Sequence, residues 1–310
     1  MTEIFASFLT VAQQIFILFL LVAVGFILGK TGLIDQSGSV VMSSVVMYAV
    51  TPAILVVSFQ RELVAADLRN FGTIALLAAV STALMIVIAS LALPGADPRR
   101  RVLRFASVMS NCAFMGYPLL SAILGPIGIF YGSAYVAVFQ LTGWTWGVWN
   151  MTGDAGRLKL RPLLTNPGVM GVAVALALYL LQIRLPAVVL APLEHLGNLN
   201  TPLPMLVVGY QLSHANLRNA LRRADAWLCM LLRLLAAPLL TLGLCCLLGV
   251  ESIAAVVLVT AASAPAAALT SMFAAKFGGD TELASGTVSV QTLCSIATMP
   301  AVIALAQHLG

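Results

Sequence analysis

Long hydrophobic segments alternate with short polar connections along the whole chain. They lie at about 11–28, 39–59, 70–93, 102–124, 128–150, 164–183, 199–213, 226–249, 252–275 and 283–307. Most of them approach the roughly 20 residues that a helix needs to cross about 30 Å of hydrocarbon. The pattern predicts an all-α membrane protein with ten transmembrane helices. The segment at 199–213 is short and opens with Pro202 and Pro204, so the first residue of its helix is harder to place than that of the other segments.

Composition agrees with a multi-pass membrane protein. Of the 310 residues, 61% are hydrophobic and 9% are charged, whereas soluble domains carry roughly 25% charged residues. The net charge of +5 comes from short basic clusters between the apolar segments, so we expect no nucleic-acid partner. The cysteines lie inside apolar runs without metal-site spacing, and we expect neither a metal nor a cofactor. They are Cys112, Cys229, Cys245, Cys246 and Cys294.

The basic residues fall mainly in one set of connections. That set holds Lys30, Arg99, Arg100, Arg101, Arg104, Arg157, Lys159, Arg161, Arg218, Arg222, Arg223 and Lys276, and the opposite set holds Arg61, Arg69 and Arg184. Cytoplasmic loops are enriched in Lys and Arg, so we expect both termini on the periplasmic side of a bacterial inner membrane. Arg233 lies about two turns into the eighth segment. We expect it to snorkel to the headgroups, with recruitment of an anion as the alternative.

The fourth segment is interrupted at its centre. Residues 111–118 read Asn-Cys-Ala-Phe-Met-Gly-Tyr-Pro. Pro118 has no amide hydrogen and clashes with the preceding turn, and Gly116 tolerates backbone angles that other residues avoid. Unwound backbone inside a bilayer is tolerated only where protein or a wet cavity satisfies it. The interruption therefore predicts a binding site, although a single proline kink is more often structural.

Two sequence patterns recur in the second half of the chain. Residues 51–60 resemble 201–211, and 66–70 resemble 215–219. The recurrence predicts two repeats of five helices, at 1–156 and 157–310, that lie inverted in the membrane because five is odd. Inverted repeats are typical of secondary transporters, whose sites lie at the repeat interface. The partner of the fourth segment is then the ninth, which carries Pro265 at its middle.

If both segments unwind and cross, the half-helices that restart near Pro118 and Pro265 point their positive ends at one place. Two such ends form an anion site without a charged side chain. The candidate substrate-binding residues are Asn111, Cys112, Gly116, Pro118, Gln140, Ser263, Pro265, Thr270 and Gln291. Helix-to-helix hydrogen bonds are the alternative role of Gln140, Gln291 and Thr270. Ser110, also near the break, and Ser263 have the alternative of bonding to their own helices.

Acidic residues occur only in the connections or at the ends of segments. Coupling to protons or sodium through a buried carboxylate is therefore disfavoured, and backbone carbonyls at the breaks are the remaining possible sodium ligands. Expelling a monoanion from a negative interior releases about 2.3 kcal/mol per 100 mV without a coupled ion. Uptake against that field requires a coupled cation.

The motif Asn111-x-x-Phe114-x-Gly116-x-Pro118 resembles the signature of the auxin efflux carrier family. Pro265, the run 275–285 and Thr298-Met299-Pro300 resemble the same family. The resemblance implies a scaffold of helices 1, 2, 6 and 7 and a moving unit of helices 3–5 and 8–10. It also implies auxin-like or malate-like carboxylate substrates and a homodimer joined through the scaffold. Gln140 and 266–268 stand where relatives often carry Asn, so the substrate stays open.

These observations predict a carrier of small organic carboxylates that works by an elevator-like movement, most simply in the efflux direction. A sodium-coupled symporter of the bile-acid type is the first alternative. A membrane sensor that binds without transporting is another. An enzyme is not expected, because Cys112 has no histidine partner in any segment.

Overall fold

The computed structural model describes residues 2–154 and 166–309, and they are helical throughout, with no named strand. The first five apolar segments fold as α1 (Thr2–Lys30); α2 (Gln36–Val45), η1 (Val46–Val50) and α3 (Thr51–Ser58); α4 (Ala65–Ala92); α5 (Pro98–Val108), η2 (Cys112–Gly116) and α6 (Tyr117–Leu124); and α7 (Pro126–Thr142), η3 (Gly143–Gly147) and α8 (Val148–Thr152). The predicted all-α class is confirmed for these residues.

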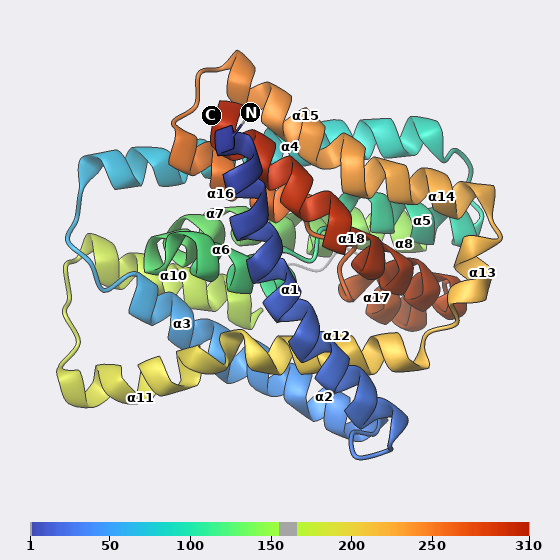
Figure 1. Ribbon diagram of the computed structural model, residues 1–310, viewed down its shortest axis with the longest axis horizontal. Coiled ribbons are helices and arrows are strands. Elements are labelled where there is room, and N and C mark those ends of the chain that lie inside the picture. The colour runs from blue at the N-terminus through green and yellow to red at the C-terminus, as the bar shows by residue number, and fades with distance from the viewer. Residues whose placement is uncertain (1, 155–165, 310) are drawn as a thin grey trace.

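The second five segments are helical as well (Figure 1). They fold as α10 (Pro167–Leu180); α11 (Ala187–Gly197), η5 (Asn198–Asn200) and α12 (Pro202–His214); α14 (Ala224–Leu231), η6 (Leu232–Ala236) and α15 (Ala237–Leu247); α16 (Ser252–Ser263) and α17 (Leu269–Phe277); and α18 (Thr281–Leu309), with the short α13 (Leu217–Leu221) before α14. Arg157, Lys159, Arg161 and the boundary between 156 and 157 lie outside the described residues.

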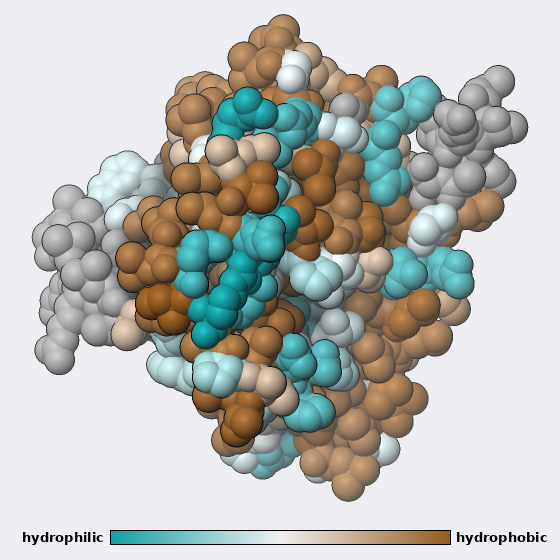
Figure 2. Space-filling model, turned by 90° about the vertical axis from the view of Figure 1, so that its left-hand side faces the viewer, coloured by the Kyte–Doolittle hydropathy of each residue, from teal (hydrophilic) through white to brown (hydrophobic). Residues whose placement is uncertain are grey.

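Five helical stretches are long and apolar enough to cross a membrane. They are Phe8–Lys30, Gln36–Ser58, Ala65–Ala92, Ala224–Leu247 and Thr281–Leu309. Many large hydrophobic side chains on them are exposed, which suits contact with lipid and not with water. Figure 2 views the end of the molecule where α3 joins α4, with hydrophilic side chains along the middle of that face and hydrophobic ones on either side. The fold is that of a multi-pass membrane protein.

The seventh segment is longer than its hydropathy indicated. Helix begins at Ala187 in α11, passes through the tight turn η5 and continues as α12. The range 199–213 therefore covers only its second part, because Pro192, Glu194 and His195 lower the hydropathy of α11. Glu194 lies in this helix, so its expected position in a connection is wrong.

Three segments contain a widened π-helical turn directly before an X-Pro pair. The turns η1, η2 and η6 precede Pro52, Pro118 and Pro238, each of which is the second residue of the following helix. A proline ring clashes with the carbonyl of the turn before it, and an extra residue in that turn relieves the clash. Proline widens these helices without ending them.

Helices α1 and α12 cross with their backbones in contact. A Cβ atom at Gly209 would lie 2.1 Å from the Val22 carbonyl oxygen, and one at Gly25 would lie 2.3 Å from that of Leu206. Only glycine permits this approach without a shift of one helix. Figure 1 shows α1 running across α12 and α18, and apolar side chains of α1 and α12 pack on Met115 and Ala264 in the interior.

Candidate functional site

The two predicted interruptions are present, and they lie against each other. Helix α5 ends at Val108, and α16 ends at Ser263. The Asn111 amide donates to the Pro265 carbonyl at 2.7 Å, and the Ala267 amide donates to the Met109 carbonyl at 2.8 Å. These paired bonds form a short antiparallel bridge between residues 109–111 and 264–268, which we call the crossover. Each unwound strand thus satisfies part of the backbone of the other.

The crossover lies about two turns before Pro118. Helix resumes at Cys112, and both Gly116 and Tyr117 have ordinary right-handed helical angles. The prediction that the fourth segment restarts near Pro118 is therefore wrong. Gly116 does not break the helix either, but packs against Ala261 of α16. The π-helical turn η2 accommodates Pro118, so the structural interpretation of this proline is correct.

Pro265 lies inside the crossover, as predicted for the ninth segment. The preceding Ala264 is extended, with φ −59° and ψ 144°. This is the conformation that a proline imposes on its predecessor, because the ring clashes with a helical one. Pro265 therefore ends α16, and helix resumes only at Leu269.

Both restarted helices leave backbone donors unused. The amides of Cys112, Ala113 and Phe114 donate to no backbone carbonyl of a described residue, and neither do those of Ala268 and Leu269. Unpaired amides at the start of a helix carry its positive dipole end and bind anions. The side chains of Ala113, Phe114, Ala268 and Leu269 are half-buried, so both helix starts are accessible.

The two helix starts lie near the fifth segment. A Cβ atom at Gly143 would lie 3.1 Å from the Met109 Cε atom and 3.3 Å from the Leu269 Cδ2 atom. Met109 of the crossover and Leu269 at the start of α17 therefore flank the same turn of η3.

Asn111 is the polar side chain at the crossover that has no partner. It is 5% exposed, and its amide group forms no hydrogen bond with any residue that the structure describes. A side-chain amide carries both donors and an acceptor, so without a protein partner it can form hydrogen bonds with a small molecule. The neighbouring Cys112 is buried, with its Cβ atom 3.5 Å from the position of a Cβ at Gly116.

Other predicted polar residues hold the crossover together. Gln291 is fully buried; its Oε1 atom accepts from the Ala266 amide at 2.9 Å, and its Nε2 atom donates to the Cys229 sulfur at 3.3 Å. The Ser110 hydroxyl donates to the Ala261 carbonyl on α16 and not to its own helix, contrary to the alternative considered for it. Gln291 and Ser110 therefore fix the geometry of the breaks.

Ser263 and Thr270 flank the break in the ninth segment, and they differ in whether their hydroxyl groups are hydrogen-bonded. The Ser263 hydroxyl donates to the Thr260 carbonyl of its own helix at 2.9 Å, as the alternative for it held. The Thr270 hydroxyl, in the first turn of α17, is fully buried and has no partner among the described residues. Thr270 is the better candidate for a polar contact near the crossover.

Gln140 faces a different helix from Gln291. Its Nε2 atom lies 3.1 Å from the position of a Cβ at Gly168, and its Oε1 atom accepts a long, 3.5 Å bond from Asn166. Asn166 also caps α10, accepting from the Gly168 and Val169 amides. Sequence analysis missed Asn166, although Asn before Pro at the start of an apolar segment is a helix-start signal.

Arg233 lies at the crossover and not at the headgroups. Its side chain is 1% exposed, and its Nη1 atom donates to the Val108 carbonyl at 2.7 Å. Its Nη2 atom donates to the Ala262 carbonyl. The expected snorkelling is wrong, because η6 turns this side chain toward the last carbonyls of α5 and α16.

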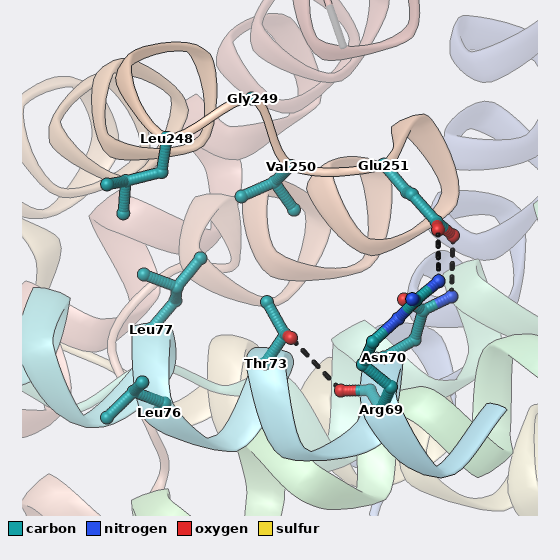
Figure 3. Close-up of a pocket in the computed structure, with 9 residues that line it drawn as sticks. All are labelled: Arg69, Asn70, Thr73, Leu76, Leu77, Leu248, Gly249, Val250 and Glu251. Atoms are coloured by element: carbon teal, nitrogen blue, oxygen red, sulfur yellow. Dashed lines mark hydrogen bonds and ion pairs between the residues drawn. The ribbon is translucent and has the colours of Figure 1, made fainter. Parts of the chain in front are cut away.

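A shallow surface hollow lies at the other end of α16, where that helix begins (Figure 3). There Glu251 accepts from Asn70 at 2.7 Å and pairs with Arg69 at 3.2 Å, which ties α4 to the start of α16. None of the predicted site residues lines this hollow. The polar groups of this hollow pair with one another and tie two helices together.

Comparison with known proteins bears on the role of this arrangement. The model of the membrane transport protein family matches residues 10–162 and 155–303. The chain belongs to the membrane transport protein family. The resemblance to auxin efflux carriers is thereby confirmed, and the family is one of transporters and not of enzymes.

Two archaeal proteins are similar to this membrane transport protein over most of its length. An "uncharacterized transporter" of Methanothermobacter thermautotrophicus is 25% identical over 307 residues, which cover 94% of this chain and 97% of that protein. An uncharacterized transporter of Methanocaldococcus jannaschii is 22% identical over 297 residues, which cover 91% of this chain and 94% of that protein.

Proposed function

We propose that this membrane transport protein carries small organic carboxylate anions and that the crossover is its binding site. The observation that carries the proposal is the set of unused donors: the Asn111 side chain beside the free amides that start η2 and α17. Each helix start contributes about 0.3–1 kcal/mol to anion binding, and up to about 2 kcal/mol when partly buried. A carboxylate with two oxygens matches two groups of N–H donors.

We further propose that the chain forms ten spans in two inverted repeats of five, with 1–156 and 157–310 as the halves. Two hydrogen bonds in corresponding positions support this. The Tyr131 hydroxyl donates to the Asp67 carboxylate at 2.7 Å, and the Asn216 amide donates to the Glu282 carboxylate at 2.6 Å. The first bond joins the start of the third segment to the start of the fifth. The second joins the connection before the eighth segment to the start of the tenth.

The exchanged bonds of the crossover also fit a pseudo-two-fold axis. Such an axis interchanges Asn111 with Ala267 and Met109 with Pro265, which turns one of the two backbone bonds into the other. Alternating access in inverted-repeat transporters moves one unit past another around a site at the repeat interface. We propose that segments 3–5 and 8–10 move in this way against segments 1, 2, 6 and 7.

Efflux is the proposed direction, with both termini on the periplasmic side of an inner membrane and a homodimer joined through the scaffold. Expulsion of a monoanion by an inside-negative potential releases about 2.3 kcal/mol per 100 mV. No coupled cation is then required. The distribution of basic residues in the connections supports the orientation.

Binding and flux test the proposal in two steps. The purified protein is first screened by thermal shift against mono- and dicarboxylates, including aromatic ones, and we expect a saturable rise in melting temperature for one class. The acids that bind are then followed as radiolabelled tracers in proteoliposomes under an imposed potential. Saturable flux supports a carrier. Binding without flux identifies a sensor, and neither binding nor flux with any acid contradicts the proposal.

A further inference from the structure

Arg233 is a buried cation with no carboxylate partner in the part of the chain that the structure describes. Its partners are the Val108 and Ala262 carbonyls, one from the last turn of each helix that enters the crossover. Tyr135 lies beside the guanidinium, and the Nε atom has no partner among the described residues. A central arginine costs about 2.5–3.5 kcal/mol on membrane-insertion scales, so its position requires a compensating interaction.

The charges at the crossover explain what Arg233 does there. The C-terminal end of a helix carries about half a negative charge, so the ends of α5 and α16 together carry about one. The guanidinium supplies one positive charge at the same carbonyls, which cancels the negative charge of these helix ends. The positive charge at the starts of η2 and α17, about one in total, then remains uncompensated and suits one carboxylate. Without Arg233, the negative charge of the two helix ends would cancel the positive charge of the two helix starts.

We propose that Arg233 is a built-in cation that takes the place of a coupling sodium ion at the crossover. Carbonyl oxygens at the breaks are the ligands that a sodium ion would use there, because no carboxylate is available. The guanidinium occupies those of Val108 and Ala262, and the amides of Asn111 and Ala267 occupy those of Pro265 and Met109. This deepens the proposed function by assigning its ion coupling: transport of the carboxylate is independent of sodium.

The experiment compares melting temperatures in sodium chloride and in choline chloride at equal ionic strength, so it requires no transported substrate. Wild type and Arg233→Met are measured with Arg184→Met as the matched control, since Arg184 is an exposed loop arginine. We expect wild type and the control to melt at the same temperature in both salts. We expect Arg233→Met to melt lower in choline and to recover by several degrees, saturably, in sodium.

Either of two melting results would overturn the assignment: saturable stabilisation of wild type by sodium, or a folded Arg233→Met protein that does not respond to sodium. If Arg233→Met folds in neither salt, Arg233→Gln keeps one donor without the charge and is measured in the same way. Wild-type flux in the two salts gives a separate readout, and sodium stimulation of that flux would also overturn the assignment. Absence of any flux, with a melting temperature indifferent to sodium, would refute the carrier and leave the role of Arg233 standing.

Discussion

Two of the crossings at which described helices bring their backbones into contact are built in opposite ways. At the crossing of α1 and α12 both helices are continuous, and glycines let them touch. At the crossover of α5–η2 with α16–α17 both helices are interrupted, and their unwound residues exchange hydrogen bonds. At the first crossing the residues in contact lie inside uninterrupted helices. The second leaves unpaired donors beside Asn111.

The difference shows why only one crossing is a candidate binding site. The interior of a continuous helix has no free backbone donors for a ligand, so close contact between two such helices contributes to packing and stability and not to binding. Interrupted helices expose donors at each restart, and in a low-dielectric interior those donors interact strongly with an anion. Each crossing therefore fails in its own way when altered: the first in stability, and the second in binding.

The largest effect on stability is expected for Gly209→Ala at the first crossing. The new methyl group would lie 2.1 Å from the Val22 carbonyl oxygen and 2.6 Å from the Phe26 nitrogen. Because both neighbours are backbone atoms, the helices must separate, at a cost of about 1–3 kcal/mol or more. Thermal unfolding in detergent measures it. Gly243→Ala is the matched control, since nothing lies within 4 Å of its added Cβ, and it should be neutral or stabilising. Equal melting temperatures for the two variants would contradict the close contact.

A smaller loss is expected for Gln291→Leu at the crossover. The substitution removes the acceptor of the Ala266 amide and leaves that amide buried and unpaired, which costs about 1–3 kcal/mol. Gln140→Leu serves as the comparison, because Gln140 is half-buried and has one long bond to Asn166. Its cost should be about 0.5 kcal/mol or less. Thermal unfolding of both variants side by side decides whether Gln291 supports the crossover.

The smallest effects are expected for the two prolines, and their signs differ. Pro265→Ala removes the constraint that holds Ala264 extended and should destabilise the protein by about 0.4–1 kcal/mol. Pro118→Ala lies within a helix and should change stability by about 0.5 kcal/mol at most, or increase it. Melting temperatures of the two alanine variants test whether Pro265 lies at a helix break and Pro118 within a helix. If Pro118→Ala destabilises the protein more than Pro265→Ala, the break has been placed in the wrong part of the fourth segment.

Sequence predicted the crossover because its signals are local. Apolar runs of membrane length gave the helices, and Pro265 in the middle of one run marked a break that the structure contains. The Asn111-x-x-Phe114-x-Gly116-x-Pro118 motif marked the other break, but its proline pointed to the wrong residue. A proline in a sequence has the same appearance whether it ends a helix or follows a π-helical turn, and only packing against α16 distinguishes the two cases.

The remaining features depend on contacts between distant residues. Gln291 reaches the Ala266 amide, and Arg233 reaches carbonyls of α5 and α16, because η6 and α18 pack on the crossover. No spacing in the sequence indicates these bonds. Arg233 was expected at the headgroups because an arginine in an apolar segment is costly at the centre. The helix ends that stabilise it belong to two other segments.

The most direct test of the central claim is carboxylate flux in proteoliposomes containing Asn111→Ala, with Ser263→Ala as the control. The Asn111 side chain has no hydrogen-bond partner to lose among the described residues, whereas the Ser263 hydroxyl is already bonded to the Thr260 carbonyl. A hydrogen bond to a charged group contributes about 1.5–3 kcal/mol, which corresponds to roughly a tenfold or greater change in affinity. We predict that Asn111→Ala keeps its melting temperature and loses at least about tenfold in flux at low substrate concentration, while Ser263→Ala transports as wild type does. Wild-type flux in Asn111→Ala would contradict a carboxylate site at the crossover.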